Sequence, residues 1–216
     1  MNTRRILELG GIAAGVLMVA FGIGSLVLGI NARSTVGDEL TREFIVGSPD
    51  MKPAEIEKAV KEAGLSNVPI PSCDVAEKEI KTGTDARCFA QYMRIHALES
   101  SGGNTYAQMG RFTLAADPTN PKGTSDEKVA LKDEKGKPVA NGPRNTWVTE
   151  TALSTALNVS YMAEQLGLFT IAVGLALLLS GVGFIILALA FFGGGFRKPV
   201  EADASPDKAA IPAPAA

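Results

Sequence analysis

Two long runs of apolar residues, 9–30 and 166–192, interrupt an otherwise mixed pattern of polar and apolar positions. About 20 consecutive apolar residues suffice for a helix to cross a hydrocarbon core of ~30 Å. About 135 charge-rich residues separate the two runs. The pattern therefore predicts two transmembrane helices, with an N-terminal segment of residues 1–8, an intervening domain of residues 31–165 and a C-terminal tail of residues 193–216.

Apolar residues continue at helical spacing beyond both runs. Val36, Leu40 and Phe44 keep a period near four after the first run, and segment 145–164 repeats apolar residues every three or four positions before the second. Nothing in segment 145–164 breaks a helix. The expected fold is an all-α membrane protein in which two antiparallel transmembrane helices extend as stalks and carry a small helical cap with one irregular loop or hairpin.

Two shorter helices are predicted between the stalks from their end signals. Ser48 or Asp50 opens a helix over residues 54–63, and Thr84 caps a second helix over residues 85–100. Glycines follow both segments, at positions where a left-handed backbone conformation ends a helix.

A third short helix and an irregular segment complete the predicted domain. Thr105 and Gln108 have the spacing of a capping box and open a helix that ends where segment 117–144 begins. Segment 117–144 is rich in Pro, Gly, Asn, Lys and Asp. Its parts 128–132 and 137–140 either pair as a small hairpin or belong to a mobile loop.

Glycines recur every seven residues in both apolar runs: Gly15, Gly22 and Gly29 in the first, and Gly167, Gly174 and Gly181 in the second. Seven residues return a helix to nearly the same face, so each helix presents a stripe without side chains and allows close packing. We expect each stripe to pack against the other helix. A second small face, Ala172, Ala176 and Ser180, and the pair Gly11 and Gly15 leave homodimerisation as an alternative.

The first run also resembles a signal peptide, since Arg4 and Arg5 precede it. Its length exceeds the 7–15 residues typical of a signal-peptide apolar core, and Ile30 lacks the small side chain that a cleavage site requires there. We therefore expect an uncleaved anchor.

Basic residues near the ends of the apolar runs predict the orientation in the membrane. Four lie on the terminal sides (Arg4, Arg5, Arg197 and Lys198), and two follow the first run on the inner side (Arg33 and Arg42). Both termini are therefore expected in the cytoplasm of a bacterial cell, with the intervening domain outside the plasma membrane. The Ala/Pro-rich tail 201–216 is expected to be disordered.

The only two cysteines, Cys73 and Cys88, both lie in the intervening domain. An even number of cysteines outside the cytosol usually indicates a disulfide. The alternative is two unrelated small core residues.

Charge and composition exclude several classes of function. Net charge is −2 over 216 residues, and the intervening domain has no basic excess, which argues against nucleic-acid binding. Neither apolar run contains an ionisable residue, although ion and proton pathways normally require one. A stand-alone transporter is therefore not expected.

No catalytic or metal-binding constellation is recognisable. His96 is the only histidine, so a zinc or iron site lacks partner ligands. Cys88 lies about 12 Å from His96 along a helix, too far for proton transfer. Ser100 is one turn from His96 but lacks an orienting acid. We predict no enzymatic activity, no cofactor and no metal.

Several short motifs carry a resemblance to a known group: Asp50-Met51-Lys52-Pro53-Ala-Glu-Ile with Ala-Gly about ten residues on, Asp85-Ala86 through Tyr92 to His96, and Gly102-Gly-Asn-Thr-Tyr106. Together with the two apolar runs, they make the chain similar to a group of uncharacterised actinobacterial two-span membrane proteins. Some members carry an aromatic ring-opening dioxygenase label, which the single histidine here does not support. The cysteine pair and segment 117–144 depart from the group's common pattern.

The expected function is that of a non-catalytic scaffold or accessory subunit of the cell envelope. Its partners would be the lipid bilayer and another membrane or envelope protein. A sensor of small ligands or envelope stress is the alternative, and an unrecognised enzyme is the third reading.

Overall fold

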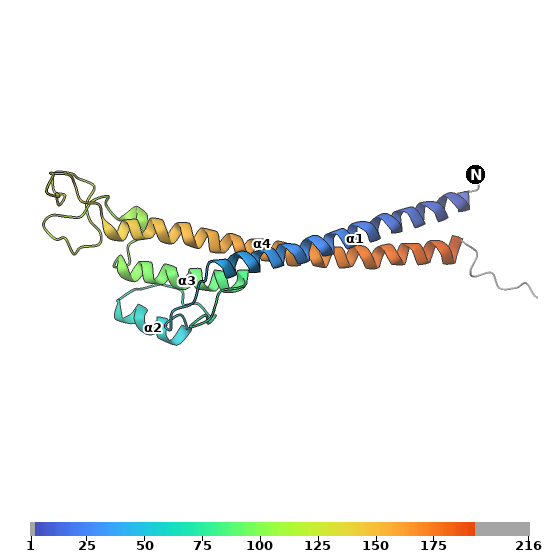
Figure 1. The fold of residues 1–216 in the computed structure, drawn as a ribbon, viewed down its shortest axis with the longest axis horizontal. Coiled ribbons are helices and arrows are strands. Elements are labelled where there is room, and N and C mark those ends of the chain that lie inside the picture. Colours follow the sequence, from blue (N-terminus) through green and yellow to red (C-terminus); the bar gives the residue numbers. More distant parts are fainter. Residues whose placement is uncertain (1–2, 193–216) are drawn as a thin grey trace, which may run out of the picture. The chain divides into compact units, whose positions relative to one another are not determined.

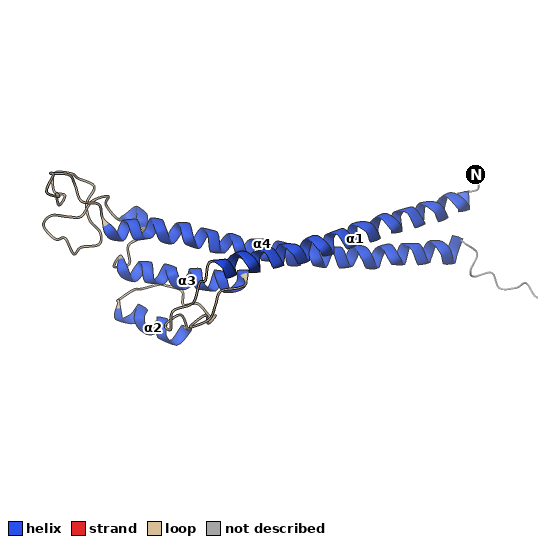
Figure 2. Ribbon diagram, viewed as in Figure 1, coloured by secondary structure: helices blue, strands red, loops and turns tan. Residues whose placement is uncertain are grey.

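The structure, a computed structural model, describes residues 3–192. Its helices, in chain order, are α1 (Thr3–Arg42), α2 (Pro53–Glu62), α3 (Gly83–Ser100), the 3₁₀ turn η1 (Tyr106–Gln108), α4 (Gly142–Leu187) and the π-helical segment η2 (Ala188–Phe192) (Figure 1). The described residues contain isolated β-bridges and no named strand (Figure 2). The all-α class is therefore confirmed.

Helices α1 and α4 are both long and apolar enough to cross a membrane. Helix α1 continues past the first apolar run to Arg42, and α4 begins at Gly142, well before the second run. Both predicted helical continuations are therefore present. Phe44 was wrongly assigned to the first of them, because it lies beyond the end of α1 with a φ of 50°.

The chain divides into two compact units, Met1–Phe21 with Leu177–Ala216, and Gly22–Ala176. In the first unit, a Cβ atom on Gly181 would lie 2.6 Å from the carbonyl oxygen of Gly15. A Cβ atom on Gly11 would lie 3.0 Å from the Cβ of Ala188. Gly11 and Gly15 therefore pack against α4 within this unit.

The second unit repeats this close packing of glycine on glycine. A Cβ on Gly174 would lie 2.8 Å from the carbonyl oxygen of Gly22, and one on Gly29 would lie 2.6 Å from the carbonyl oxygen of Gly167. All four residues are buried. The six glycines of the two heptad stripes thus pair across α1 and α4 within their respective units.

A hydrophobic core lies where α2, α3 and their connecting segments meet. Its most deeply buried large side chains are Tyr92, Ile56, Ile80 and Val75. Tyr92 donates a hydrogen bond from its hydroxyl to the carbonyl oxygen of Cys73 at 2.7 Å. Cys73 lies at disulfide distance from Cys88 on α3, with the two sulfur atoms 2.04 Å apart.

Helix α3 lies beside α4, as Figure 1 shows. Gly83, the first residue of α3, has no side chain because its Cβ would lie 2.7 Å from the carbonyl oxygen of Ser160. Near the other end of α3, the indole nitrogen of Trp147 donates to the hydroxyl of Ser101 at 3.2 Å. These contacts fix α3 along about four turns of α4.

Two predicted caps are wrong by a few residues. The N-cap of α3 is Thr82, whose hydroxyl accepts a hydrogen bond from the backbone N–H of Asp85, and not Thr84. The N-cap of α2 is Lys52, which makes no side-chain cap, and the hydroxyl of Ser48 instead donates to Asp50. Proline at the start of α2 removes one of the N–H groups that a cap would satisfy.

The third short helix is also wrong in its length. The predicted capping box of Thr105 and Gln108 is present, but it closes only the 3₁₀ turn η1. Gly110 then passes so close to Thr124 that a Cβ would lie 2.2 Å from a backbone atom, and its N–H donates to Lys122. The backbone N–H groups of this segment therefore make tertiary hydrogen bonds, and the segment does not continue as a helix.

Segment 117–144 follows the hairpin alternative. Lys132 and Pro138 form an antiparallel bridge, and the N–H of Val139 donates to the carbonyl of Leu131 at 2.8 Å. The N–H of Leu131 in turn donates to Thr113, so the segment before 117 becomes a third arm. The predicted basic residues Arg197 and Lys198 and the predicted disordered tail lie outside the described residues.

Candidate binding groove

An open groove of about 630 Å³ lies where the C-terminal end of α1 meets α3 and α4. Seven apolar residues line it: Leu40, Ile45, Phe89, Met93, Leu153, Ala156 and Leu157. Glu39, Glu43 and Ser160 are the polar residues of its lining. The groove is therefore a mainly apolar surface with two acidic side chains.

The groove exists because α1 ends before it covers the adjoining faces of α3 and α4. Leu40, two residues before the end of α1, is buried, whereas Leu153 on α4 is 49 % exposed. On α3, Phe89 and Met93 lie four residues apart, so both side chains face the groove from consecutive turns. Of the groove lining, Leu40 and Leu157 are buried, Phe89 and Met93 are half-buried, and Leu153 is exposed.

The larger side chains of α3 point in three directions. Phe89 and Met93 face the groove, Tyr92 is buried in the core, and His96 turns toward the segment that precedes α2. The spacing of apolar residues on α3 does not show that α1 ends at Arg42 and covers α3 no further.

The two acidic residues of the groove differ in their partners. Glu39 accepts a hydrogen bond from the guanidinium of Arg42 at 2.8 Å. Within residues 3–192, Glu43 makes no ion pair within 4.0 Å. Glu39 lies in the last turn of α1 and Glu43 directly after its end, so Glu43 adds negative charge beside the apolar lining.

Phe44 lies directly after the groove residue Glu43 and is 85 % exposed. Its φ of 50° places a bulky side chain in the left-handed region, which costs free energy for any residue with a Cβ. Val46 beside it is 52 % exposed. Two large apolar side chains therefore extend into solvent next to the groove.

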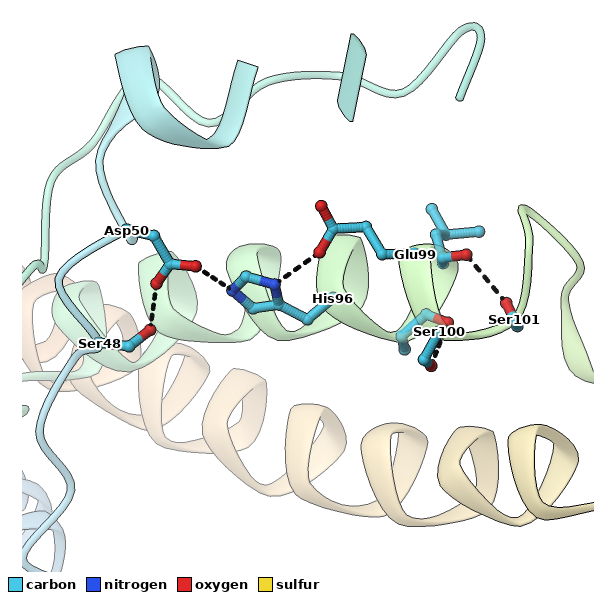
Figure 3. Close-up of polar contacts among 8 residues, drawn as sticks. Ser48, Asp50, His96, Glu99, Ser100 and Ser101 are labelled. Carbon is cyan, nitrogen blue, oxygen red and sulfur yellow. Dashed lines mark hydrogen bonds and ion pairs between the residues drawn. The ribbon is translucent and has the colours of Figure 1, made fainter. Parts of the chain in front are cut away.

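His96 lies between two carboxylates at a different place on α3 (Figure 3). Its Nδ1 is 2.8 Å from Oε2 of Glu99, and its Nε2 is 3.4 Å from Oδ2 of Asp50. The hydroxyl of Ser48 donates to the other oxygen of Asp50 at 2.5 Å. The cluster joins the segment before α2 to α3.

The candidate catalytic pairs are not assembled around His96. The hydroxyl of Ser100 donates to the carbonyl of Ala97 at 3.0 Å, and Cys88 is paired with Cys73. Among the residues that the structure describes, no group of three or more His, Cys, Asp or Glu side chains is placed to hold a metal ion.

A buried carboxylate near the second apolar run was missed by sequence reasoning. Glu164 on α4 accepts hydrogen bonds from the N–H of Thr84 at 2.9 Å and from its hydroxyl at 3.3 Å. Arg33 on α1 lies 3.6 Å from the other carboxylate oxygen. Glu164 therefore links α1, α3 and α4 two residues before the apolar run begins. Its position beside that run was the only signal in the sequence.

Comparison of the chain with models of known protein families, with curated proteins and with solved structures finds no match.

Proposed function

We propose that the protein is a membrane-anchored interaction subunit of the cell envelope. Helices α1 and α4 cross the plasma membrane as an antiparallel pair, with both termini in the cytoplasm. Residues 31–165 form an extracytoplasmic cap. The groove between α1, α3 and α4 binds an apolar helix of another membrane or envelope protein.

The length of the two apolar helices and their glycine contacts support the anchoring. Lipid tails are as apolar as the side chains of the helices, so the hydrophobic effect does not drive two helices together within the membrane. Close packing of backbone against backbone at glycines favours their association instead. The disulfide pair supports an oxidising compartment for the cap, because structural disulfides persist outside the cytosol.

The apolar groove is the observation that carries the functional proposal. An uncovered apolar surface rimmed by charge is typical of a protein interaction site. An amphipathic helix fills such a groove by presenting apolar residues at positions i, i+3, i+4 and i+7. Acidic side chains at Glu39 and Glu43 favour a partner helix with basic residues beside its apolar face.

Phe44 supplies a second argument for an interaction at this place. Residues held in a strained backbone conformation tend to cluster at functional sites. A phenylalanine in the left-handed region that stays exposed gains nothing from the core in return. Burial of this side chain against a bound partner would offset the cost.

An apolar small molecule is the second candidate occupant. The groove volume of about 630 Å³ lies within the usual range for ligand pockets. In that case the protein is a sensor, and occupancy of the groove changes the contacts among α1, α3 and α4.

Photocrosslinking in intact cells tests the two candidates. A benzoylphenylalanine in place of Leu153 should capture a protein through an apolar helix with basic flanks, whereas the same group in place of the exposed Lys58 on α2 should not. Glu39→Lys with Glu43→Lys should reduce the yield at least tenfold by charge repulsion.

The outcomes separate the proposals. Adducts at Leu153 that do not respond to the reversed charges contradict the acidic recognition of the helix. If an apolar molecule copurifies and blocks crosslinking, and no protein adduct forms, the result contradicts the partner helix and supports the sensor. Absence of both overturns the groove as a binding site.

A further inference from the structure

Helix α4 carries an uninterrupted heptad pattern of exposed residues. Steps of four and three residues alternate along it over four heptads. The nine positions, named here the α4 seam, are Val148, Ala152, Thr155, Val159, Met162, Leu166, Phe169, Val173 and Ala176. All nine are exposed in the structure. A strict repeat of 3.5 residues over several heptads is typical of a helix that pairs with another helix in a coiled coil.

The opposite face of α4 packs within its own domain. Glu150, Leu157 and Glu164 recur at the same seven-residue spacing and are all buried. Gly167 and Gly174 are also buried, against α1. The contacts with α1 and α3 therefore leave the α4 seam free.

Lipid does not account for the membrane-distal half of the α4 seam. Leu166 is the first residue of the apolar run, and Val148 lies 18 residues before it, roughly 27 Å along a helix. Val148, Val159 and Met162 are 53 %, 59 % and 63 % exposed. These side chains lie beyond the predicted span and remain uncovered by the chain itself.

We infer that the α4 seam pairs with the same seam of a second copy, so that the protein is a parallel homodimer. This inference rests on the proposed anchoring, because two copies inserted with one topology hold their α4 helices parallel. Identical residues then meet along a two-fold axis, which is the geometry of an isologous interface.

The residues that flank the α4 seam favour a second copy over a different protein. Heterotypic coiled coils usually select their partner by opposite charges beside the apolar positions. Here the flanking positions over the membrane-distal half are uncharged: Thr149, Thr151, Ala156, Asn158, Ala163 and Gln165. Two identical seams therefore meet without like-charge repulsion and without a charge pattern that would require another partner.

Polar groups on and beside the α4 seam are already satisfied within the helix. The hydroxyl of Thr155 donates to the carbonyl of Thr151 at 2.7 Å, and the amide of Asn158 donates to the carbonyl of Ser154 at 2.7 Å. Burial of a polar group costs most when its hydrogen bonds are lost. Dimerisation therefore leaves the Thr155 hydroxyl donor and one N–H of the Asn158 amide paired within the helix.

Cysteine crosslinking of the full chain in isolated membranes tests the dimer. Val159→Cys and Met162→Cys should each give a disulfide-linked dimer on mild oxidation. Leu153→Cys is the matched control, since Leu153 lies on the same helix with similar exposure but off the α4 seam. We expect at least tenfold less linked dimer from this control.

A second pair of variants tests the apolar nature of the interface. Val159→Cys combined with Met162→Glu should lose at least nine tenths of its crosslinking. Val159→Cys combined with Thr146→Glu should retain it, because Thr146 is exposed on α4 outside both the α4 seam and the groove. Equal crosslinking from all positions, or a linked product with a mass other than that of two chains, overturns the proposal. Carbonate extraction of the same membranes tests the anchoring separately. Monomeric protein in the membrane pellet contradicts only the dimer. Protein in the supernatant contradicts the anchoring.

Discussion

Replacing Gly181 by alanine adds one methyl group at a close contact of α4 with α1. The ideal Cβ would lie 2.6 Å from the carbonyl oxygen of Gly15 and 2.9 Å from the backbone nitrogen of Val19. A carbon and a carbonyl oxygen in favourable contact lie about 3.3–3.6 Å apart. Both neighbours belong to the backbone, so the two helices must separate locally by several tenths of an ångström. Overpacking of this kind costs about 1–3 kcal/mol.

The control is Gly183→Ala, two residues further along the same helix. A Cβ at Gly183 would meet no atom within 4 Å, so the substitution changes helix propensity without a clash. Alanine in place of glycine in a helix interior stabilises by roughly 0.5–1 kcal/mol. The two alanine variants should therefore differ in opposite directions from the unsubstituted protein.

The free energy of helix separation can be measured by SDS titration in mild detergent. Fluorophores on Leu9→Cys and Leu189→Cys flank the contact of Gly11 with Ala188 and report the separation by energy transfer. Gly181→Ala should lower the equilibrium constant for the paired state by roughly 5- to 150-fold, since 1.4 kcal/mol corresponds to a factor of ten. If Gly181→Ala is no more destabilising than Gly183→Ala, the close glycine packing is refuted.

Three further variants test the cap. Replacing Cys73 and Cys88 by serine should lower the free energy of unfolding by about 3 kcal/mol for a loop of 15 residues, as read from urea titration of tryptophan fluorescence. Burial, and secondly the negative charge of Asp74, raises the pKa of Tyr92 above its usual 10.0. The folded chain therefore holds the Tyr92 proton more tightly than the unfolded chain. This contribution to the free energy of unfolding is complete below pH 10.0 and is lost as the pH rises through the folded pKa. Tyr92→Phe should reduce the loss of stability at alkaline pH. Glu164→Ala leaves the N–H of Thr84 without its acceptor and should cost about 1–3 kcal/mol in the same urea titration; an unchanged midpoint would contradict its role in joining the helices.

The fold follows from the sequence where the signals are periodic. The glycines recur on one face of each apolar run, and a Cβ atom on Gly15, Gly29, Gly174 or Gly181 would lie less than 3.0 Å from an atom of the other helix. Helices α2 and α3 were also found within a few residues, since polar residues before them and glycines after them mark their ends. In these elements the local preference and the tertiary contacts favour the same conformation.

The sequence was misleading where tertiary hydrogen bonds compete with local signals. The capping box at Thr105 and Gln108 is real, yet the chain leaves the helical conformation one turn later, because Gly110 bonds to Lys122 across the irregular segment. Thr82 and Thr84 are equally suitable caps by type. With Thr82 as the cap, the N–H of Thr84 lies in the first turn of α3 and is satisfied by Glu164 from another helix.

The groove could not be predicted, because it depends on the exact end of α1. Periodicity continued through Phe44 and suggested a helix that would cover α3 and α4 further. The chain instead turns at Phe44 and exposes Leu153. The heptad spacing of the α4 seam can be read from the sequence. Only the structure shows that the opposite face of α4 is buried and that the α4 seam itself is exposed.

Accessibility labelling tests the proposed anchoring most directly. Ser125 lies in the irregular segment of the cap and Ser205 lies in the C-terminal tail, and the native cysteines are paired. In intact cells, a membrane-impermeant maleimide should label Ser125→Cys and should label Ser205→Cys only after the cells are opened, while the unsubstituted chain stays unlabelled. Labelling of Ser205→Cys but not of Ser125→Cys in intact cells would place the groove in the cytoplasm and contradict the proposed function.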